Sequence, residues 1–273
     1  MESEPNAQAD VAAEIGKQYS LAKILGIWVA VVAPMVILAY VVKPAIAPDF
    51  ETDPIGVGKI KLGLLSVGLI WQFVLSLIIV YRERGNLHWA TIRQRLWLNT
   101  PRDPKTGESR RKLWLWLIPF ILLIFIIWSL SPPLWDRWFV SLFPVFAAPP
   151  DGNIGEFLQQ PEIQAQLVGD WVFLGLFLLL AVFNILGEEF IFRGVLLPKM
   201  EGVFGKWDWV ANGVLFGGYH WHQPWQIPGS ILVGIFALAL PAKRFRSTWM
   251  SIIIHSFQYV ILPAAILGVL GIV

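Results

Sequence analysis

Long apolar runs separated by short polar segments dominate this chain. Nearly every position in these runs is apolar, whereas the strands of a membrane barrel would alternate apolar and polar residues. About 20 apolar residues are enough for a helix to cross a bilayer, and a helix satisfies its own backbone groups in lipid. The pattern therefore predicts an all-α fold, a polytopic bundle of transmembrane helices.

Seven runs are predicted to span the membrane, and the sixth is short enough to be tilted or partly buried. Their approximate ranges are 24–42, 62–81, 113–130, 171–197, 207–225, 228–240 and 248–273. Residues 134–147 are also apolar and aromatic, but Pro132 and Pro133 precede them and Pro144 interrupts them. This segment is expected to be interfacial or re-entrant, or alternatively an eighth span.

Composition agrees with a membrane protein and removes several chemistries. Hydrophobic residues make up 56% of the chain, above the 45–50% of a typical soluble chain. Several of the 15 tryptophans stand near the ends of runs, as in an interfacial belt. The chain has no cysteine, so disulfides, thiolate metal sites and cysteine nucleophiles are excluded. A net charge of +2 gives no sign of a nucleic-acid partner.

Lysine and arginine predict the orientation, because they gather in cytoplasmic loops. The loop 82–112 holds nine of them, whereas 131–170 holds only Arg137. The loop 82–112 is therefore expected to be cytoplasmic, and so is the N-terminus, which two spans separate from it. Lys43, Lys59 and Lys61 would lie outside as a mild exception.

The chain divides into three predicted regions. Residues 1–23 are polar and lack the basic start and apolar core of a secretory signal, so they are expected to form a solvated cytoplasmic tail. Residues 24–170 form an N-terminal transmembrane region that includes the basic loop. Residues 171–273 carry the polar residues that point to chemistry.

Ionisable side chains inside a bilayer are costly and indicate function. The fourth predicted span contains Glu188, Glu189 and Arg193. The spacing of Glu189 and Arg193 allows an ion pair on one helical face. Such a pair could belong to a functional site or could equally be structural and hold two helices together. Glu188 points about 100° away on an ideal helix, so it is expected to face a different partner.

Two histidines complete the candidate site. His220 follows Gly217 and Gly218, which would let a neighbouring helix approach closely. His222 lies about 200° round an ideal helix from His220, so both are not expected to serve one site. His255 stands in the last span. Helical rise places Glu188, His220 and His255 at similar depths, where they could surround a water molecule or a metal ion.

This constellation suits hydrolysis of an amide bond. A carboxylate can act as general base towards water, and imidazoles can ligate zinc or donate hydrogen bonds to an oxyanion. Both readings remain open from the residues: His220 and His255 as zinc ligands, or a metal-free site.

The order Glu-Glu-x-x-x-Arg, Phe-x-x-x-His and a late histidine resembles the CPBP family of intramembrane proteases, over about residues 171–265. That family includes CAAX prenyl endopeptidases and bacterial proteins linked to bacteriocin self-protection. The resemblance implies that Glu188 is the general base, that Glu189 and Arg193 complete its motif, and that Phe216 precedes His220. It also implies a membrane protein or lipidated peptide as substrate.

One position departs from the family pattern, which usually has Asn four residues after the last histidine. Here Tyr259 stands there, beside Gln258. This favours somewhat the leading alternative, a non-catalytic membrane scaffold or bacteriocin-immunity-type protein. A proton-coupled transporter is a third reading, but its charges would be expected in both halves. The His-Glu-x-x-His, Gly-x-Gly-Asp and Gly-x-Ser-Gly motifs of other intramembrane proteases are missing.

Overall fold

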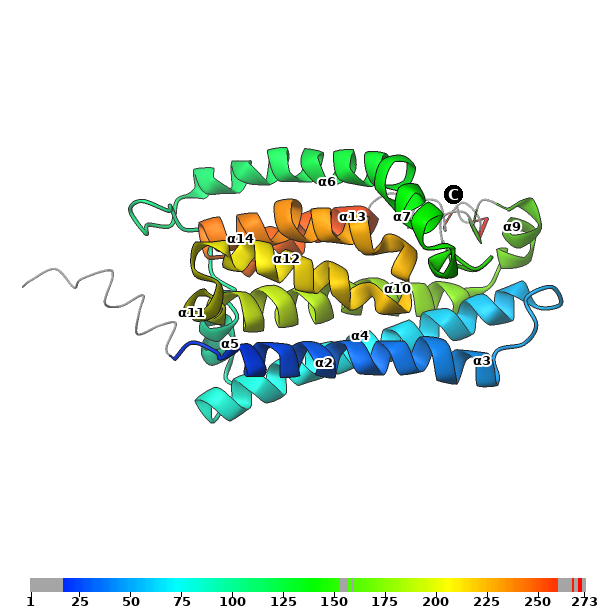
Figure 1. Ribbon diagram of the computed structural model, residues 1–273, viewed down its shortest axis with the longest axis horizontal. Helices are drawn as coiled ribbons and strands as arrows, with labels where there is room; N and C mark the ends of the chain where they lie inside the picture. The colour runs from blue at the N-terminus through cyan, green and yellow to red at the C-terminus, as the bar shows by residue number, and fades with distance from the viewer. Residues whose placement is uncertain (1–16, 153–156, 159, 260–266, 268–269, 272–273) are drawn as a thin grey trace, which may run out of the picture.

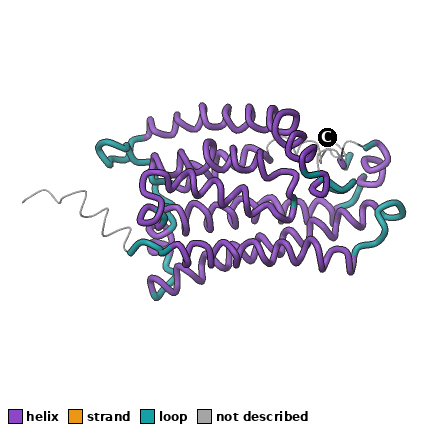
Figure 2. The backbone as a smooth tube through the Cα atoms, in the orientation of Figure 1, coloured by secondary structure: helices purple, strands orange, loops and turns teal. Residues whose placement is uncertain are grey.

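Helices lie side by side in an elongated bundle in the computed structural model (Figure 1). The structure describes residues 17–152, 157–158, 160–259, 267 and 270–271. Within these residues the backbone is helical or in loops, without a named strand (Figure 2). The predicted all-α fold is confirmed.

Five helical stretches in the described part of the chain are long and apolar enough to cross a membrane: Leu21–Ile46, Pro54–Arg84, Arg111–Ser131, Trp171–Lys199 and Pro224–Phe245. They contain the first four predicted spans and the sixth. The sixth is longer than predicted, because the helix begins at Pro224 and continues through Pro241 to Phe245.

The N-terminal region is built from α2 and α4, which lie next to each other (Figure 1), followed by α6. Its elements are α2 (Leu21–Ile37), the π-helical turn Leu38–Val42, α3 (Lys43–Ile46), α4 (Pro54–Arg84), α5 (Trp89–Arg95), the 3-10 turn Arg111–Trp116, α6 (Leu117–Ser131), the π-helical turn Pro132–Asp136, α7 (Arg137–Leu142), the 3-10 turn Pro144–Phe146 and α9 (Pro161–Leu167).

The C-terminal region alternates α-helix with π-helical and 3-10 turns. Its elements are α10 (Trp171–Glu188), the π-helical stretch Glu189–Leu196, the 3-10 turn Leu197–Lys199, α11 (Glu201–Phe204), the 3-10 turn Gly205–Trp207, α12 (Asp208–Gly218), the 3-10 turns Tyr219–His222 and Pro224–Gln226, α13 (Ile227–Leu232), the π-helical stretch Val233–Ala239, α14 (Leu240–Phe245), α15 (Thr248–Ser256) and the 3-10 turn Phe257–Tyr259.

The predicted fifth and seventh spans are shorter α-helices than expected. Helix α12 ends at Gly218 and is followed by 3-10 turns. The seventh predicted span is α15 and the 3-10 turn up to Tyr259, and most of its remainder lies outside the described residues.

Local sequence explains where the long helices begin and end. Ser20, Asp53 and Asp170 precede α2, α4 and α10, and each side chain accepts a hydrogen bond from a backbone N–H of the first turn. Such caps satisfy donors that a helix start leaves open. Helix α4 ends at Gly85, whose φ of 75° glycine adopts without strain.

The N-terminal tail joins the bundle earlier than predicted. Tyr19 is buried, its hydroxyl donates to Glu83 Oε1 at 2.5 Å, and it accepts from Arg95 Nη2 at 2.8 Å. Helix α2 starts at Leu21. The expectation of a solvated tail up to residue 23 is therefore wrong for these last residues, because an aromatic ring and a buried arginine anchor them.

The proline-rich segment 134–147 folds back against the end of the bundle. The Asp136 carboxylate accepts a hydrogen bond from the backbone N–H of Gly229 at 3.1 Å, and the Phe146 ring meets Trp221 edge-on. Many of its apolar side chains stay exposed, Val145 among them. This segment closes one side of the cavity described below.

Candidate active site

Glu188 is the last residue of α10, at a change in helical geometry. The next eight residues, Glu189–Leu196, form π-helical turns, which are uncommon and often mark functional sites. Close packing against α4 fixes this point, because a Cβ on Gly187 would collide with the Leu69 carbonyl oxygen. The sequence thus places the first glutamate where two helices touch.

The Glu188 carboxylate has one occupied oxygen and one open oxygen. Its Oε1 accepts from Asn184 Nδ2 and from the Tyr219 hydroxyl, both at 2.7 Å. Its Oε2 lies 3.8 Å from His255 Nε2. That separation is too long for a direct hydrogen bond, and a water molecule can bridge such a gap. Two donors therefore fix the carboxylate while leaving Oε2 for chemistry.

The Glu189 carboxylate is buried on a different face of the same helix. Its Oε1 accepts from Arg193 Nη1 at 3.2 Å, and both side chains have no exposed surface. The predicted Glu189–Arg193 pair is therefore present. The guanidinium also lies 4.1 Å from the centroid of the Phe216 ring and donates to the Gly234 carbonyl oxygen at 3.4 Å. This arginine thus ties three helical segments together.

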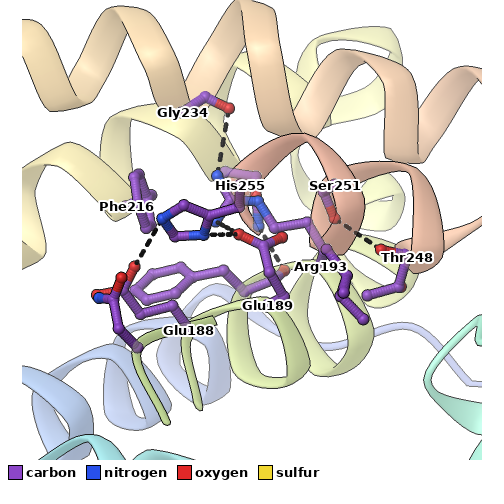
Figure 3. Close-up of polar contacts among 12 residues, drawn as sticks. Glu188, Glu189, Arg193, Phe216, Gly234, Thr248, Ser251 and His255 are labelled. Atoms are coloured by element: carbon purple, nitrogen blue, oxygen red, sulfur yellow. Dashed lines mark hydrogen bonds and ion pairs between the residues drawn. The ribbon is translucent and has the colours of Figure 1, made fainter. Parts of the chain in front are cut away.

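His255 lies between the two carboxylates (Figure 3). Its Nδ1 lies 2.9 Å from Glu189 Oε1, and its Nε2 points towards Glu188. Because an ionised carboxylate only accepts hydrogen bonds, Nδ1 carries the proton in this pair. Glu189 therefore orients the imidazole and leaves Nε2 facing the open oxygen of Glu188.

His220 is fixed by its own helix. Its Nδ1 lies 3.0 Å from the Phe216 carbonyl oxygen. A carbonyl oxygen only accepts, so Nδ1 donates and the neutral ring presents a lone pair at Nε2. Phe216 therefore contacts Arg193 through its ring and His220 through its carbonyl, which accounts physically for the Phe-x-x-x-His spacing.

The ideal-helix geometry that separated His220 from His222 in the prediction does not hold. Helix α12 ends at Gly218, the backbone at His220 has ψ 26°, and the two imidazoles stack with centroids 5.6 Å apart. Both line the same cavity. Of the two preceding glycines, Gly217 allows the predicted close approach, since a Cβ there would lie 2.6 Å from the Ile231 backbone nitrogen; Gly218 has ordinary space.

A cavity of about 810 Å³ brings these groups together. Glu188, His220 and His255 all line it, whereas Glu189 and Arg193 do not. The structure thus separates the predicted site residues into a set that faces the cavity and a pair packed behind His255. Burial raises the strength of both sets of contacts, because water does not screen them.

Comparison with protein families gives one match. Residues 170–261 match the family described as type II CAAX prenyl endopeptidase Rce1-like. We refer to this segment, which is similar to that family, as the Rce1-like domain. It covers α10, α12, the Pro224–Phe245 helix and α15, so all five predicted site residues fall inside it. Searches of curated proteins and of solved structures returned no match.

Two residues of the Rce1-like domain that sequence reasoning did not single out contact Glu188: Asn184 and Tyr219. Asn184 stands one helical turn before Glu188 within an apolar run, so the spacing alone could have predicted a contact between the two side chains. Tyr219 becomes visible only when α12 packs against α10. Both line the cavity.

Tyr259 makes a contact that the family pattern does not suggest. Its hydroxyl donates to Asn184 Oδ1 at 2.9 Å, and Gln258 Nε2 donates to the same oxygen at 2.8 Å. With its oxygen held twice, the Asn184 amide presents its nitrogen to Glu188. Tyr259 therefore supports Glu188 through Asn184.

The zinc reading gains no support from the donor set of the Rce1-like domain. A protein zinc site uses at least three ligands. In the described residues no group of three or more His, Cys, Asp or Glu side chains is arranged to hold a metal ion. The Nδ1 atoms of His220 and His255 are engaged by Phe216 and Glu189, which leaves Nε2 of each ring for the chemistry of the site.

Proposed function

We propose that this protein is an intramembrane endopeptidase that hydrolyses a peptide bond of a membrane-associated substrate. The observation that carries the proposal is the state of Glu188: Oε1 is held by two donors, and Oε2 faces a cavity 3.8 Å from His255 Nε2. The Rce1-like match supports an endopeptidase of the CAAX type.

In the proposed reaction Glu188 acts as general base. Its Oε2 takes a proton from a water molecule as the water oxygen bonds to the scissile carbonyl carbon. The tetrahedral intermediate then collapses, the C–N bond breaks, and the proton passes to the leaving nitrogen. The products are a carboxylic acid and an amine, which then ionise as carboxylate and ammonium, and Glu188 returns to its ionised form. General bases of this kind contribute about 10²- to 10⁴-fold to rate.

The two histidines take different parts in this proposal. His255, oriented by Glu189, can carry a proton at Nε2 and donate to the oxyanion. His220 presents a lone pair at Nε2 when neutral, so it is assigned to holding the attacking water by accepting a hydrogen bond. Arg193 neutralises Glu189, which keeps a second negative charge from competing with Glu188.

The experiment is cleavage of candidate membrane peptides by the purified protein in detergent, comparing the wild type with Glu188→Ala. The expected result is cleavage by the wild type and loss of at least about 100-fold in the variant, with helix content unchanged by circular dichroism. Glu162→Ala, which changes an exposed glutamate of α9, is the matched control. Equal cleavage by wild type and Glu188→Ala would contradict the assignment.

The competing proposal is a membrane scaffold that keeps this fold without cleaving. Tyr259 at the position usually held by Asn motivated it. The contact of Tyr259 with Asn184 speaks against it, because the substitution is absorbed into the support of Glu188. A wild-type protein that cleaves none of the membrane peptides would favour the scaffold.

A further inference from the structure

The cavity occupies only one end of the bundle. Along α4 its lining runs from Gly58 to Leu69, in the N-terminal half of the helix, and along α10 it runs from Phe177 to Glu188. On α6 it reaches only the C-terminal end, at Trp128 and Ser131. Glu188 therefore lies at the deep end of a cavity that extends to α7.

The basic residues gather at the opposite end. The loop 82–112 leaves the C-terminus of α4, and the backbone N–H of Arg102 bonds the Phe245 carbonyl oxygen at the end of α14. Figure 1 shows α5, α11 and α14 at that end, with α3, α7 and α9 at the other. Bilayer insertion keeps such basic loops in the cytoplasm.

Lysines at the cavity end do not offset this asymmetry. Lys59 pairs with Asp170 at 2.5 Å, and Lys43 and Lys61 both pair with Asp151. These three lysines thus share two carboxylates, Asp170 and Asp151. The three lysines form local ion pairs, and they are few beside the nine lysines and arginines of the loop 82–112, whose number sets the orientation.

The chemistry of the lining changes with depth. The mouth, defined as Asp136, Arg137 and Ser141, is polar and charged, whereas the walls below it are apolar, including Leu62, Leu65 and Leu180. The deep end is polar again at Glu188 and the histidines. Such a profile fits an extended peptide that enters from water and places apolar side chains against the walls.

A second cavity of about 280 Å³ continues the first sideways. The two share lining residues such as Met35, Lys61 and His222. Its outer wall is the turn Leu38–Val42 after α2, where Tyr40 and Val41 are exposed. These exposed apolar side chains lie in a predicted span, so this cavity points towards lipid.

We infer that the site acts on a membrane-anchored polypeptide whose scissile segment lies on the side of the membrane opposite the basic loop, that is, on the non-cytoplasmic side. The segment enters past the mouth, and its membrane anchor lies beside the side cavity at the turn after α2. The inference rests on the proposed endopeptidase function and adds the side of the membrane from which the substrate enters the site.

The natural absence of cysteine makes single-cysteine labelling a clean test. Three exposed serine or threonine positions are changed one at a time. Ser141→Cys lies at the mouth, Thr52→Cys lies at the same end outside the cavity lining, and Ser109→Cys lies in the basic loop. The probe is a membrane-impermeant polyethylene glycol maleimide, applied to intact expressing cells and to permeabilised cells.

The expected result is labelling of Ser141→Cys and Thr52→Cys in intact cells, with Ser109→Cys labelled only after permeabilisation. In detergent, modification of Ser141→Cys is expected to reduce cleavage at least tenfold, and modification of Thr52→Cys or Ser109→Cys to leave it unchanged. Labelling of Ser109→Cys in intact cells, or full cleavage by modified Ser141→Cys, would overturn the inference.

The two proposals fail in different ways. Labelling in intact cells reports the side of the cavity whether or not the protein cleaves anything. The comparison of wild type with Glu188→Ala in detergent has no sides and reports only the chemistry. Glu188-dependent cleavage with inverted labelling would thus overturn the inference and keep the proposed function.

Discussion

Glu188 and Glu189 are neighbours in the chain and have opposite surroundings. Glu188 meets neutral donors, Asn184 and Tyr219, and keeps one oxygen towards a cavity. Glu189 meets the charged Arg193 and the ring of His255, and it lines no part of that cavity. A rotation of one residue along the helix therefore places one glutamate at the cavity and buries the other in an ion pair.

The difference between Glu188 and Glu189 shows how a helical bundle can keep one carboxylate oxygen without a hydrogen-bond donor in an apolar interior. A buried charge needs a partner, and Glu189 has a full counter-charge within 3.2 Å. Glu188 is held by dipoles on one oxygen only. His255 contacts Glu189 through Nδ1 and faces Glu188 through Nε2. The buried Glu189–Arg193 pair therefore sets the direction in which the imidazole faces Glu188.

The largest effect on stability is expected at Arg193. In Arg193→Ala, Glu189 would remain buried without its counter-charge, which costs about 3–5 kcal/mol. Unfolding followed by circular dichroism in detergent should show this loss. Arg93→Ala removes an exposed arginine and should change the free energy of unfolding by less than about 0.5 kcal/mol. Equal stability of the two variants would contradict the supporting role of the pair.

A smaller effect, on rate, is expected at Tyr219. The change Tyr219→Phe removes one of the two hydrogen bonds to Glu188 Oε1, and a bond to a charged group contributes about 1.5–3 kcal/mol. The kcat for a cleaved peptide should fall about tenfold to a hundredfold. Tyr81→Phe, at an exposed tyrosine near the end of α4, is the control. An unchanged kcat in Tyr219→Phe would mean that Glu188 does not depend on this donor.

A still smaller effect is expected at Tyr259, which acts on Glu188 only through Asn184. The change Tyr259→Phe leaves Gln258 bonded to Asn184 and removes a neutral hydrogen bond of about 0.5–1.5 kcal/mol. Cleavage should slow by about tenfold or less. A loss as deep as that of Glu188→Ala would instead make the Tyr259 hydroxyl part of the chemistry.

No effect is expected from metal removal. Since the proposed reaction uses Glu188 and the two histidines without a metal, dialysis against 1,10-phenanthroline should leave the cleavage rate of the purified protein unchanged. Loss of activity that added zinc restores would contradict the metal-free account and return His220 and His255 to the ligand reading.

Sequence patterns predicted the features that depend on short-range geometry. The apolar runs predicted the five helical stretches that are long and apolar enough to cross a membrane, because length and hydropathy decide which segments enter lipid. The spacing of Glu189 and Arg193 gave their pair. The approach of helices at Gly217 also followed from the residue type.

Features that depend on departures from ideal helices could not be predicted in this way. The stacking of His220 on His222 follows from 3-10 turns after Gly218, which packing imposes and the local sequence does not announce. The hydroxyl of Tyr219 reaches Glu188 from another helix. The pairing of Lys61 with Asp151 joins residues 90 positions apart, beyond the reach of any local pattern.

The most direct test of the divided roles compares Glu188→Gln and Glu189→Gln on the same preparations, with the cleavage rate and the free energy of unfolding measured for each. The account predicts that Glu188→Gln keeps wild-type stability and loses at least about 100-fold in cleavage rate. It predicts that Glu189→Gln loses stability, because Arg193 is left without its counter-charge. A Glu188→Gln protein that cleaves at the wild-type rate would contradict the account.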